Sequence, residues 1–479
     1  MPQGIGGWGD GESVGTLQGV TRASGEMADA LASGASDRKI VGVQVPPRPP
    51  LGSGLNFPSL LTKSCATVKV VTGDIYILGG YQSDFARNYV KQGLEVSDIV
   101  SEVLTQTWVD SQIEPTDIET IHVANAFGQL FNGQGQLGGM PATVEPALWG
   151  IPASRHEAAC ASGGIAILAA MADIEAGRYE CALVVGVEQE RNVPGDQAAI
   201  NLGAAAWIGH EGQGVVHMWP HMFSLLADEY DARYGIESQH LSAIAELNFR
   251  NAKTNPNAQT RAWSHTPESF ADDDVVNPTV VGRIRRSDCS QLTDGGVGLV
   301  LAKRAKAEEW ASRRGLSIES VPRIVGWGHR TVGLPLAEKL QRSAGDEYVM
   351  PHVRRAITDA FLRAGIADVA GIDGIETHDC FTPSEYMAID HFGITAPGES
   401  WKAIEEGRLE RDGSIPMNPS GGLIGGGHPV GATGVRMVLD ASRQVTGRAG
   451  ENQVDGARTF ATLNIGGSTT TTVSFVVAV

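Results

Sequence analysis

The chain has 479 residues, which is enough for about three average domains or for two halves with a large insertion. Hydrophobic residues make up 42% and charged residues 19%, and no apolar run reaches the ~18–20 residues that span a bilayer, which argues against a transmembrane protein. With 37 basic and 55 acidic residues the net charge is −18, which repels phosphate backbones and argues against nucleic acid as a partner.

Residues 1–72 are rich in Gly, Ser and Pro and show no sustained helical or strand period, so we predict an extension outside the core. The start lacks the features of a secretory signal, and it carries Asp10, Glu12 and Glu26, which a mitochondrial presequence avoids. The last residues, 475–479, are typical of a strand and are not a Ser-Lys-Leu signal. These features predict a cytoplasmic location.

From residue 73 the pattern changes to alternating strands and amphipathic helices. The sequence predicts a strand at 75–80, a helix at 96–111 and a strand at 118–124. A small-residue segment then leads into an Ala-rich helix, and the strand Cys-Ala-Leu-Val-Val-Gly-Val-Glu at 181–188 follows. This alternation predicts an α/β fold.

About a hundred residues separate the strand at 184–190 from the next strand, at 294–302, and they contain one clear helical stretch at 222–235. A structureless loop of that length is uncommon in a compact domain. We therefore predict an inserted subdomain, here called the loop domain, and we expect substrate contacts in it.

The remaining residues repeat the order strand, helix, strand. Without gaps, segment 118–127 aligns with 372–381 and pairs three apolar positions: Ile118 with Ile372, Ile121 with Ile375, and Phe127 with Phe381. Each segment is followed by small residues that enter a helix and then by another strand. Two similar α/β halves related by pseudo-twofold symmetry are the simplest interpretation.

Cys160 lies among small residues, in Ala-Ala-Cys-Ala-Ser-Gly-Gly, just before the predicted Ala-rich helix. The positive end of a helix dipole favours a thiolate, and small neighbours let an acyl group approach the sulfur. The alternative is a buried thiol that only fills space, which is the usual fate of a free cysteine. Cys160 is therefore a candidate nucleophile.

His428 follows five glycines in eight residues and precedes Pro429. Such a segment turns sharply and brings an imidazole into a narrow cleft, although a lone histidine is more often structural. The segment contains neither a Gly-Lys-Ser/Thr sequence nor a GxGxxG fingerprint, so neither a P-loop nor a dinucleotide site is indicated. A nucleotide-dependent oxidoreductase is rejected because no Rossmann fingerprint follows the strand at 75–80.

His378 and Cys380 follow the predicted strand at 372–377, where parallel strands deliver residues into a cleft. They alternate along the chain, so in extended backbone both face one way. Two ligands without a partner pair are a weak metal site, and we predict no metal. The more specific interpretation of these two residues is that Cys380 acts as a general acid/base and that His378 orients a water molecule. The five cysteines include no CxxC pair, so neither a disulfide framework nor a zinc ribbon is suggested.

At this point the sequence resembles the thiolases, and within them the sterol carrier protein type, over about residues 73–479. The segments that carry the resemblance are AACASGG around Cys160, HDCF at 378–381, GGGHPVGATG around His428, and NIGG at 464–467. Classical thiolases take their acid/base cysteine from a CxG motif near the C-terminus, where this chain has Asn464. Sterol carrier protein type thiolases resemble this chain in taking it from HDCF, which identifies Cys380.

The resemblance implies an α/β thiolase fold with two similar βαβαβαββ halves, five strands each, in five α/β/α/β/α layers. It divides the chain into an N-terminal extension, a first half with an inserted loop domain, and a second half. The bounds that we predict are 1–72 for the extension, 73–195 and 286–318 for the first half, 196–285 for the loop domain, and 319–479 for the second half.

The resemblance also implies the roles of the site residues. Cys160 is the nucleophile, His428 its base and Cys380 the acid/base group. One oxyanion hole uses His428 and a water on His378, and the other uses the backbone N–H groups of Cys160 and Gly466. His221 and Met222 resemble the family's pantetheine-lining pair, although they could equally be packing residues.

The activity implied is that of an acyltransferase, an acetyl-CoA C-acyltransferase or acetyltransferase of lipid or sterol side-chain metabolism, such as β-oxidation. It cleaves a 3-ketoacyl-CoA with CoA, or runs the Claisen condensation in reverse. CoA is a substrate, no cofactor is bound permanently, and a homodimer or tetramer is expected. The alternatives are a retro-aldolase or ketoacyl synthase on the same fold, and a catalytically silent acyl-CoA-binding subunit.

Overall fold

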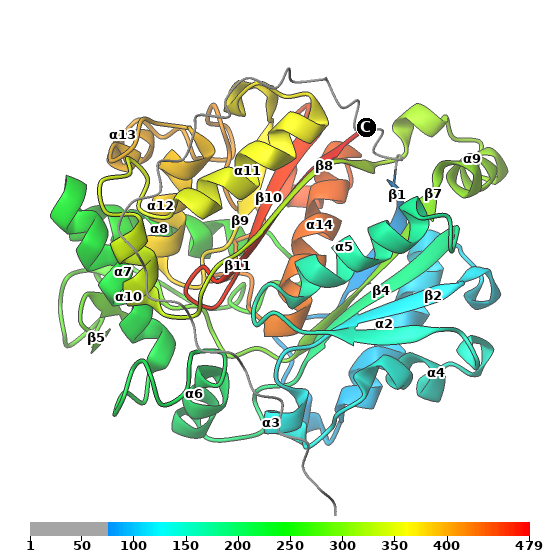
Figure 1. The fold of residues 1–479 in the computed structure, drawn as a ribbon, viewed down its shortest axis with the longest axis horizontal. Helices are drawn as coiled ribbons and strands as arrows, with labels where there is room; N and C mark the ends of the chain where they lie inside the picture. The colour runs from blue at the N-terminus through cyan, green and yellow to red at the C-terminus, as the bar shows by residue number, and fades with distance from the viewer. Residues whose placement is uncertain (1–74) are drawn as a thin grey trace, which may run out of the picture. The chain divides into compact units, whose positions relative to one another are not determined.

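The computed structural model describes residues 75–479, so the extension predicted at 1–72 lies outside the described residues. Nine strands of this part form one mixed sheet in the order β3-β2-β4-β7-β1-β8-β11-β10-β9 (Figure 1). Their bounds are β1 (Ile75–Gln82), β2 (Thr120–Ala124), β3 (Ala153–His156), β4 (Cys181–Glu188), β7 (Gly295–Lys303), β8 (Arg323–Thr331), β9 (Gly374–Thr377), β10 (Thr459–Gly466) and β11 (Thr471–Ala478).

The helices follow the predicted periodicity closely, and the helix expected at 96–111 is α2 with the same bounds. The α-helices are α2 (Val96–Ser111), α3 (Gly128–Asn132), α4 (Met140–Val144), α5 (Ser162–Glu175), α6 (Gly195–Gly203), α7 (Met218–Tyr234), α8 (Ser238–Ala252), α9 (Arg304–Arg313), α10 (Leu336–Arg342), α11 (Pro351–Ala364), α12 (Thr382–Phe392), α13 (Ser400–Glu405) and α14 (Thr433–Val445). None of these helices is both long enough and apolar enough to cross a membrane.

The two predicted halves are visible in the strand order. The first half supplies β3-β2-β4-β7-β1 and the second supplies β8-β11-β10-β9, and a short β1–β8 ladder of two residue pairs joins them. The second half has no counterpart of β3, because Ile375 pairs with Met417 only as an isolated bridge. The next residue, Asn418, adopts the left-handed conformation with φ 49°, which ends the pairing there.

Five layers follow from how the helices pack. Helix α2 covers the outer face of the first half and α11 covers the outer face of the second, while α5 and α14 lie between the halves (Figure 1). A buried cluster between the halves joins side chains of β1, α5, β7, α14 and β11. The predicted α/β fold with α/β/α/β/α layers is therefore confirmed.

The two central helices approach each other through glycine. A Cβ on Gly163 of α5 would lie 2.6 Å from the backbone nitrogen of Val435, and a Cβ on Gly434 of α14 would collide with the backbone nitrogen of Gly164. Only glycine permits backbones to come this close. The contact sets the N-terminal ends of α5 and α14 side by side.

Between β4 and β7 lie α6, α7, α8 and the small hairpin of β5 (Thr279–Val281) and β6 (Ile284–Arg285). The helix predicted at 222–235 begins one turn earlier, at Met218. Helices α7 and α8 pack on α12, and their buried side chains belong to the core cluster of the second half. The bounds 196–285 stay a prediction for the loop domain.

Candidate active site

Cys160 lies in a tight turn between β3 and α5. The preceding residue, Ala159, has a positive φ of 50°, which is rare for a residue with a side chain. The hydroxyl of Ser162 accepts the N–H of Ala158 at 2.9 Å and donates to the carbonyl of Ala159 at 2.6 Å. This turn fixes the nucleophile candidate immediately before the first turn of α5.

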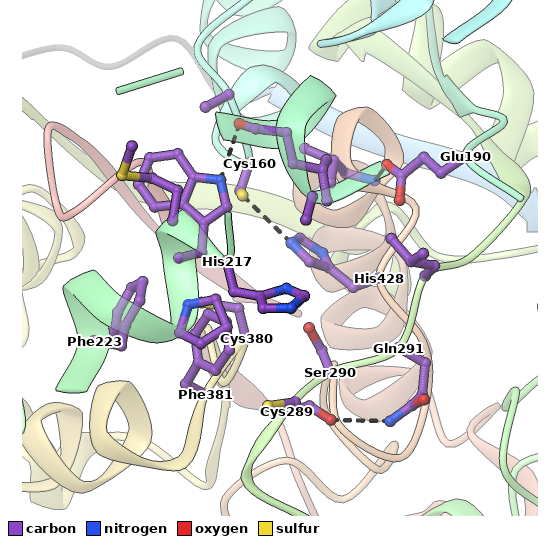
Figure 2. A pocket seen from close by; sticks show the side chains of 18 of the residues that line it. Cys160, Glu190, His217, Phe223, Cys289, Ser290, Gln291, Cys380, Phe381 and His428 are labelled. Atoms are coloured by element: carbon purple, nitrogen blue, oxygen red, sulfur yellow. Dashed lines mark hydrogen bonds between the residues drawn. The ribbon is translucent and has the colours of Figure 1, made fainter. Parts of the chain in front are cut away.

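His428 faces Cys160 although 268 residues separate them: its Nε2 is 3.3 Å from Sγ, and Figure 2 shows the two side chains turned toward each other. The other ring nitrogen, Nδ1, lies 2.7 Å from the hydroxyl of Thr433. The backbone N–H of His428 donates to the hydroxyl of Thr293 at 2.8 Å. Thr433 and Thr293 therefore fix the position of the imidazole, and Nε2 remains available to the thiol of Cys160.

Burial keeps both members of this pair neutral. Burial, and then the nearby carboxyl of Glu190, raises the pKa of Cys160 to about 12, although the backbone N–H groups of Gly467 and Cys160 act against the rise. Burial and the Arg436 guanidinium lower the pKa of His428 to about 3. Desolvation and Glu190 therefore oppose the thiolate that the helix dipole is expected to favour at Cys160.

His378 and Cys380 come to the same place from the end of β9. The rings of His378 and His428 meet edge to face with centroids 5.3 Å apart. Cys380 is 5% exposed and lines the pocket that Cys160 and His428 also line. Burial, and then Cys160, raises the pKa of the Cys380 thiol well above its ordinary value. The structure thus brings together all four residues that the sequence singled out.

The glycine-rich segment before His428 is held by Asp379. Its carboxylate accepts the N–H groups of Leu423 at 2.6 Å and Ile424 at 3.0 Å. A Cβ on Gly422, where φ is 60°, would overlap this carboxylate. Glycine is required there for close approach, and the contact ties the end of β9 to the segment that delivers His428.

Cys160, Cys380 and His428 line a mainly apolar pocket of about 320 Å³, and His378 lies buried behind His428. His221 and Met222, expected to line it, do not: Met222 is buried in the core of the second half, and the lining falls one helical turn earlier, on His217 and Met218. Both pairs read His-Met, and it is the earlier pair, at the start of α7, that lines this pocket. The other apolar lining residues include Phe127, Leu202, Trp219, Phe223, Phe381 and Val430.

Sequence reasoning missed two further pocket residues. Glu190 is 1% exposed, lines the pocket and accepts the N–H of Val430 at 3.1 Å. Cys289 lines the pocket as a half-buried free thiol. The apolar strand before Glu190 gave one signal, since a carboxylate directly after a buried strand in a cleft is a candidate for function.

The turn after β10 closes the site on the other side. Gly466 packs its backbone against the turn of Ala158, but the N–H that interacts with the Cys160 thiol belongs to the next residue, Gly467. Beneath this turn the buried amino group of Lys339, whose pKa burial lowers to about 7, bonds to the carbonyl and hydroxyl of Ser468 and to the hydroxyl of Thr470, at 2.5, 2.8 and 2.8 Å. The sequence gave no sign of Lys339.

Chemically, the arrangement places the half-buried thiol of Cys160 against an imidazole, the buried thiol of Cys380 in the same pocket, and backbone donors beside the Cys160 sulfur. These are the parts that covalent acyl transfer requires: a nucleophile, its base, a second acid/base group and an oxyanion site.

Comparison with known proteins gives a consistent result. Residues 75–305 match the family described as "Thiolase, N-terminal domain", and residues 337–478 match "Thiolase C-terminal domain-like". An acetyl-CoA acetyltransferase of Methanothermobacter thermautotrophicus is 29% identical over 407 residues, covering 82% of this chain and 97% of that protein. Sterol carrier protein 2 of Homo sapiens is 24% identical over 408 residues, covering 82% and 70%. Among solved structures, the "Ltp2-ChsH2(DUF35) aldolase" aligns with a TM-score of 0.66 at 22% identity, covering 85% of this chain and 98% of that one.

Proposed function

Because the chain belongs to the thiolase family, we propose that it catalyses CoA-dependent thiolytic cleavage of a 3-ketoacyl-CoA, or the reverse Claisen condensation. The observation that carries the proposal is the 3.3 Å contact between Cys160 Sγ and His428 Nε2, at the pocket that Cys380 also lines.

In the first step Cys160 attacks the 3-keto carbonyl carbon. Since both groups rest neutral, the proton moves from Sγ to His428 Nε2 as the sulfur–carbon bond forms. The bond between C2 and C3 then breaks, which leaves an acyl group on Cys160 and the enolate of the shortened acyl-CoA. Cys380 protonates C2 of this enolate and becomes a thiolate.

In the second step CoA enters as a thiol. Cys380 takes its proton, the CoA sulfur attacks the acyl-enzyme carbonyl, and Cys160 leaves and regains the proton from His428. After the second step Cys160, His428 and Cys380 have all returned to their starting protonation states. Synthesis follows the same path in reverse.

Charge that develops on oxygen would meet fixed donors. The backbone N–H groups of Cys160 and Gly467 flank the sulfur, and we assign them to the thioester oxyanion in place of the Gly466 N–H that was expected. The enolate oxygen would lie against His428 and His378. Glu190, beside Cys160, adds to the rise in the pKa of that thiol, while burial raises the pKa of the Glu190 carboxyl itself.

The test is the intact mass of the protein after brief incubation with acetoacetyl-CoA, with and without free CoA, beside Cys160→Ala. An adduct with the mass of one acetyl group, lost on addition of CoA and missing in the variant, supports the proposal. If no adduct forms with short, long or branched 3-ketoacyl-CoAs, covalent thiolase chemistry is rejected.

A second candidate is an aldolase, because one of the solved structures that share this fold is named as one. A retro-aldol cleavage needs no acyl enzyme, whereas here a thiol lies within reach of an imidazole. Cleavage of a 3-hydroxyacyl-CoA without any covalent adduct would favour this candidate. The same substrates distinguish the two remaining alternatives. A ketoacyl synthase would decarboxylate its substrate, and a silent subunit would show no turnover.

The CoA substrate, the oligomeric state and the compartment are further parts of the proposal. We expect acyl-CoA and CoA as the small-molecule partners, a homodimer or tetramer that light scattering would reveal, and a cytoplasmic location. Comparison of short, long and branched 3-ketoacyl-CoAs as substrates shows which acyl group the protein prefers. That preference distinguishes lipid from sterol side-chain metabolism.

A further inference from the structure

Three side chains of the site converge at a distance suited to a metal ion. One ligand atom from each of Cys160, His378 and His428 lies within 4.8 Å of the others. They come from three separate segments, which precede α5, follow β9 and precede α14. Thiolate sulfur and imidazole nitrogen are the ligands that zinc prefers, and three protein ligands with one open position are typical of an accessible zinc site.

His378 supplies an independent observation. Its side chain is 1% exposed, and its Nδ1 is buried without a hydrogen-bond partner among the described residues. A buried polar nitrogen without a partner costs free energy, and a bound ion next to the ring would compensate for this by coordination. The ring lies edge to face on His428, and one of its nitrogens is already within 4.8 Å of the other two ligand atoms.

His428 is oriented as metal-binding histidines usually are. The hydroxyl of Thr433 lies 2.7 Å from Nδ1, which fixes the ring and directs Nε2 toward Cys160 Sγ at 3.3 Å. Such outer partners set the tautomer and direction of a ligating imidazole. The pocket of about 320 Å³ beside the cluster leaves room for water in the fourth position.

We propose that Cys160, His378 and His428 form a reversible inhibitory site for one zinc ion or a similar divalent transition metal. On binding, the metal–sulfur bond forms, the thiol proton leaves to solvent, and Zn²⁺ with one thiolate gives a net charge of +1. The metal is not a cofactor, because it occupies both the nucleophile and its base. The inhibition rests on the proposed function, whereas the binding does not.

Binding is measured on the resting full-length protein, reduced and free of oxygen, by titration with Co²⁺. We expect one equivalent of cobalt to produce thiolate charge-transfer absorption together with the visible bands of tetrahedral cobalt, and Zn²⁺ to displace it. Cys160→Ser should abolish the charge-transfer band, and His378→Phe should weaken cobalt binding by at least about 10-fold. Cys289→Ser is the matched control, because that thiol lines the same pocket outside the cluster, and it should bind as wild type.

A second measurement guards against variants that fold poorly: wild-type protein alkylated at Cys160 should no longer give the band. The proposal is overturned if no saturable band appears, if it survives in Cys160→Ser and in the alkylated protein, or if Cys289→Ser loses it equally. Zn²⁺ should also stop formation of the acyl enzyme, and a chelator should restore it. A protein that binds cobalt as expected but never acylates would refute the proposed function and leave the metal site standing.

Discussion

The side-chain amide of Asn464 donates a hydrogen bond to the backbone carbonyl of Cys160 at 2.9 Å, across 304 positions of the chain. Its Oδ1 also accepts the N–H of Gly164, at 3.3 Å. Asn464 stands where classical thiolases, by resemblance, carry their second cysteine. In this chain it instead fixes the backbone of Cys160 and of Gly164, on both sides of the turn into α5.

We expect Asn464→Ala to slow acylation and to lower the free energy of unfolding by about 1–3 kcal/mol, because the Gly164 N–H is left buried without a partner. Denaturant unfolding and single-turnover mass spectrometry measure the two effects. Asn464→Asp keeps the acceptor but loses the donor to Cys160, so it separates the two bonds. Wild-type acylation in both variants would contradict this role.

Cys380→Ala should still form the acyl enzyme, but turnover should fall by about 10²–10⁴-fold, because the enolate then lacks its proton donor. Quenched-flow mass spectrometry follows the acyl enzyme, and steady-state assays follow turnover. Cys181→Ala is the control, since that thiol is buried in β4 away from the pocket. Equal loss of acylation in Cys160→Ala and Cys380→Ala would refute the division of roles.

The raised pKa of Cys160 predicts how alkylation depends on pH. Because the folded thiol has a pKa of about 12, nearly all of it is protonated near neutral pH, and the reactive thiolate grows as pH rises. The rate of Cys160 alkylation by iodoacetamide should therefore increase by about tenfold per pH unit from pH 6 to 9 without a plateau. Peptide-resolved mass spectrometry isolates this cysteine from the others. A plateau near pH 7 would indicate a stabilised thiolate instead.

Gly434→Ala should separate the two central helices. The added methyl group meets the backbone of Gly164, so we expect a loss of about 1–3 kcal/mol in stability and a larger loss of acylation, since Cys160 and His428 lie at the ends of these helices. Gly139→Ala is the matched control, because nothing lies within 4 Å of a Cβ there and its φ is ordinary. Unfolding midpoints and acylation rates of the two variants test this prediction, which is wrong if Gly434→Ala behaves like Gly139→Ala.

Lys339→Met should release the turn that presents the Gly467 N–H. Three hydrogen bonds of the amino group are lost, and the loss of one oxyanion donor typically costs about 10²–10³-fold in rate. We expect kcat to fall by up to about 10²–10³-fold. KM should change little. Arg342→Ala, on the exposed side of the same helix, should be silent. A change in KM alone would indicate a role in substrate binding.

Local patterns in the sequence determined the elements and the candidate reactive groups. The period of 3.6 residues gave α2 with its bounds, and the alternation of strands and helices gave the α/β order. Small residues around Cys160 and glycines before His428 identified both segments as candidates. Close approach of backbones requires small residues, so it is visible in the local composition. The HDCF segment identified His378 and Cys380 through resemblance to a family.

Tertiary structure decided what depends on distances between remote segments. The helical period alone does not tell which of the two His-Met pairs, His217 with Met218 or His221 with Met222, lines the pocket, and the structure places the first pair there. The protonation state of Cys160 depends on burial and on Glu190, neither of which a local dipole argument includes. Lys339, Asn464 and Gly467 act through contacts with residues far along the chain, and such contacts exist only once the two halves have packed together.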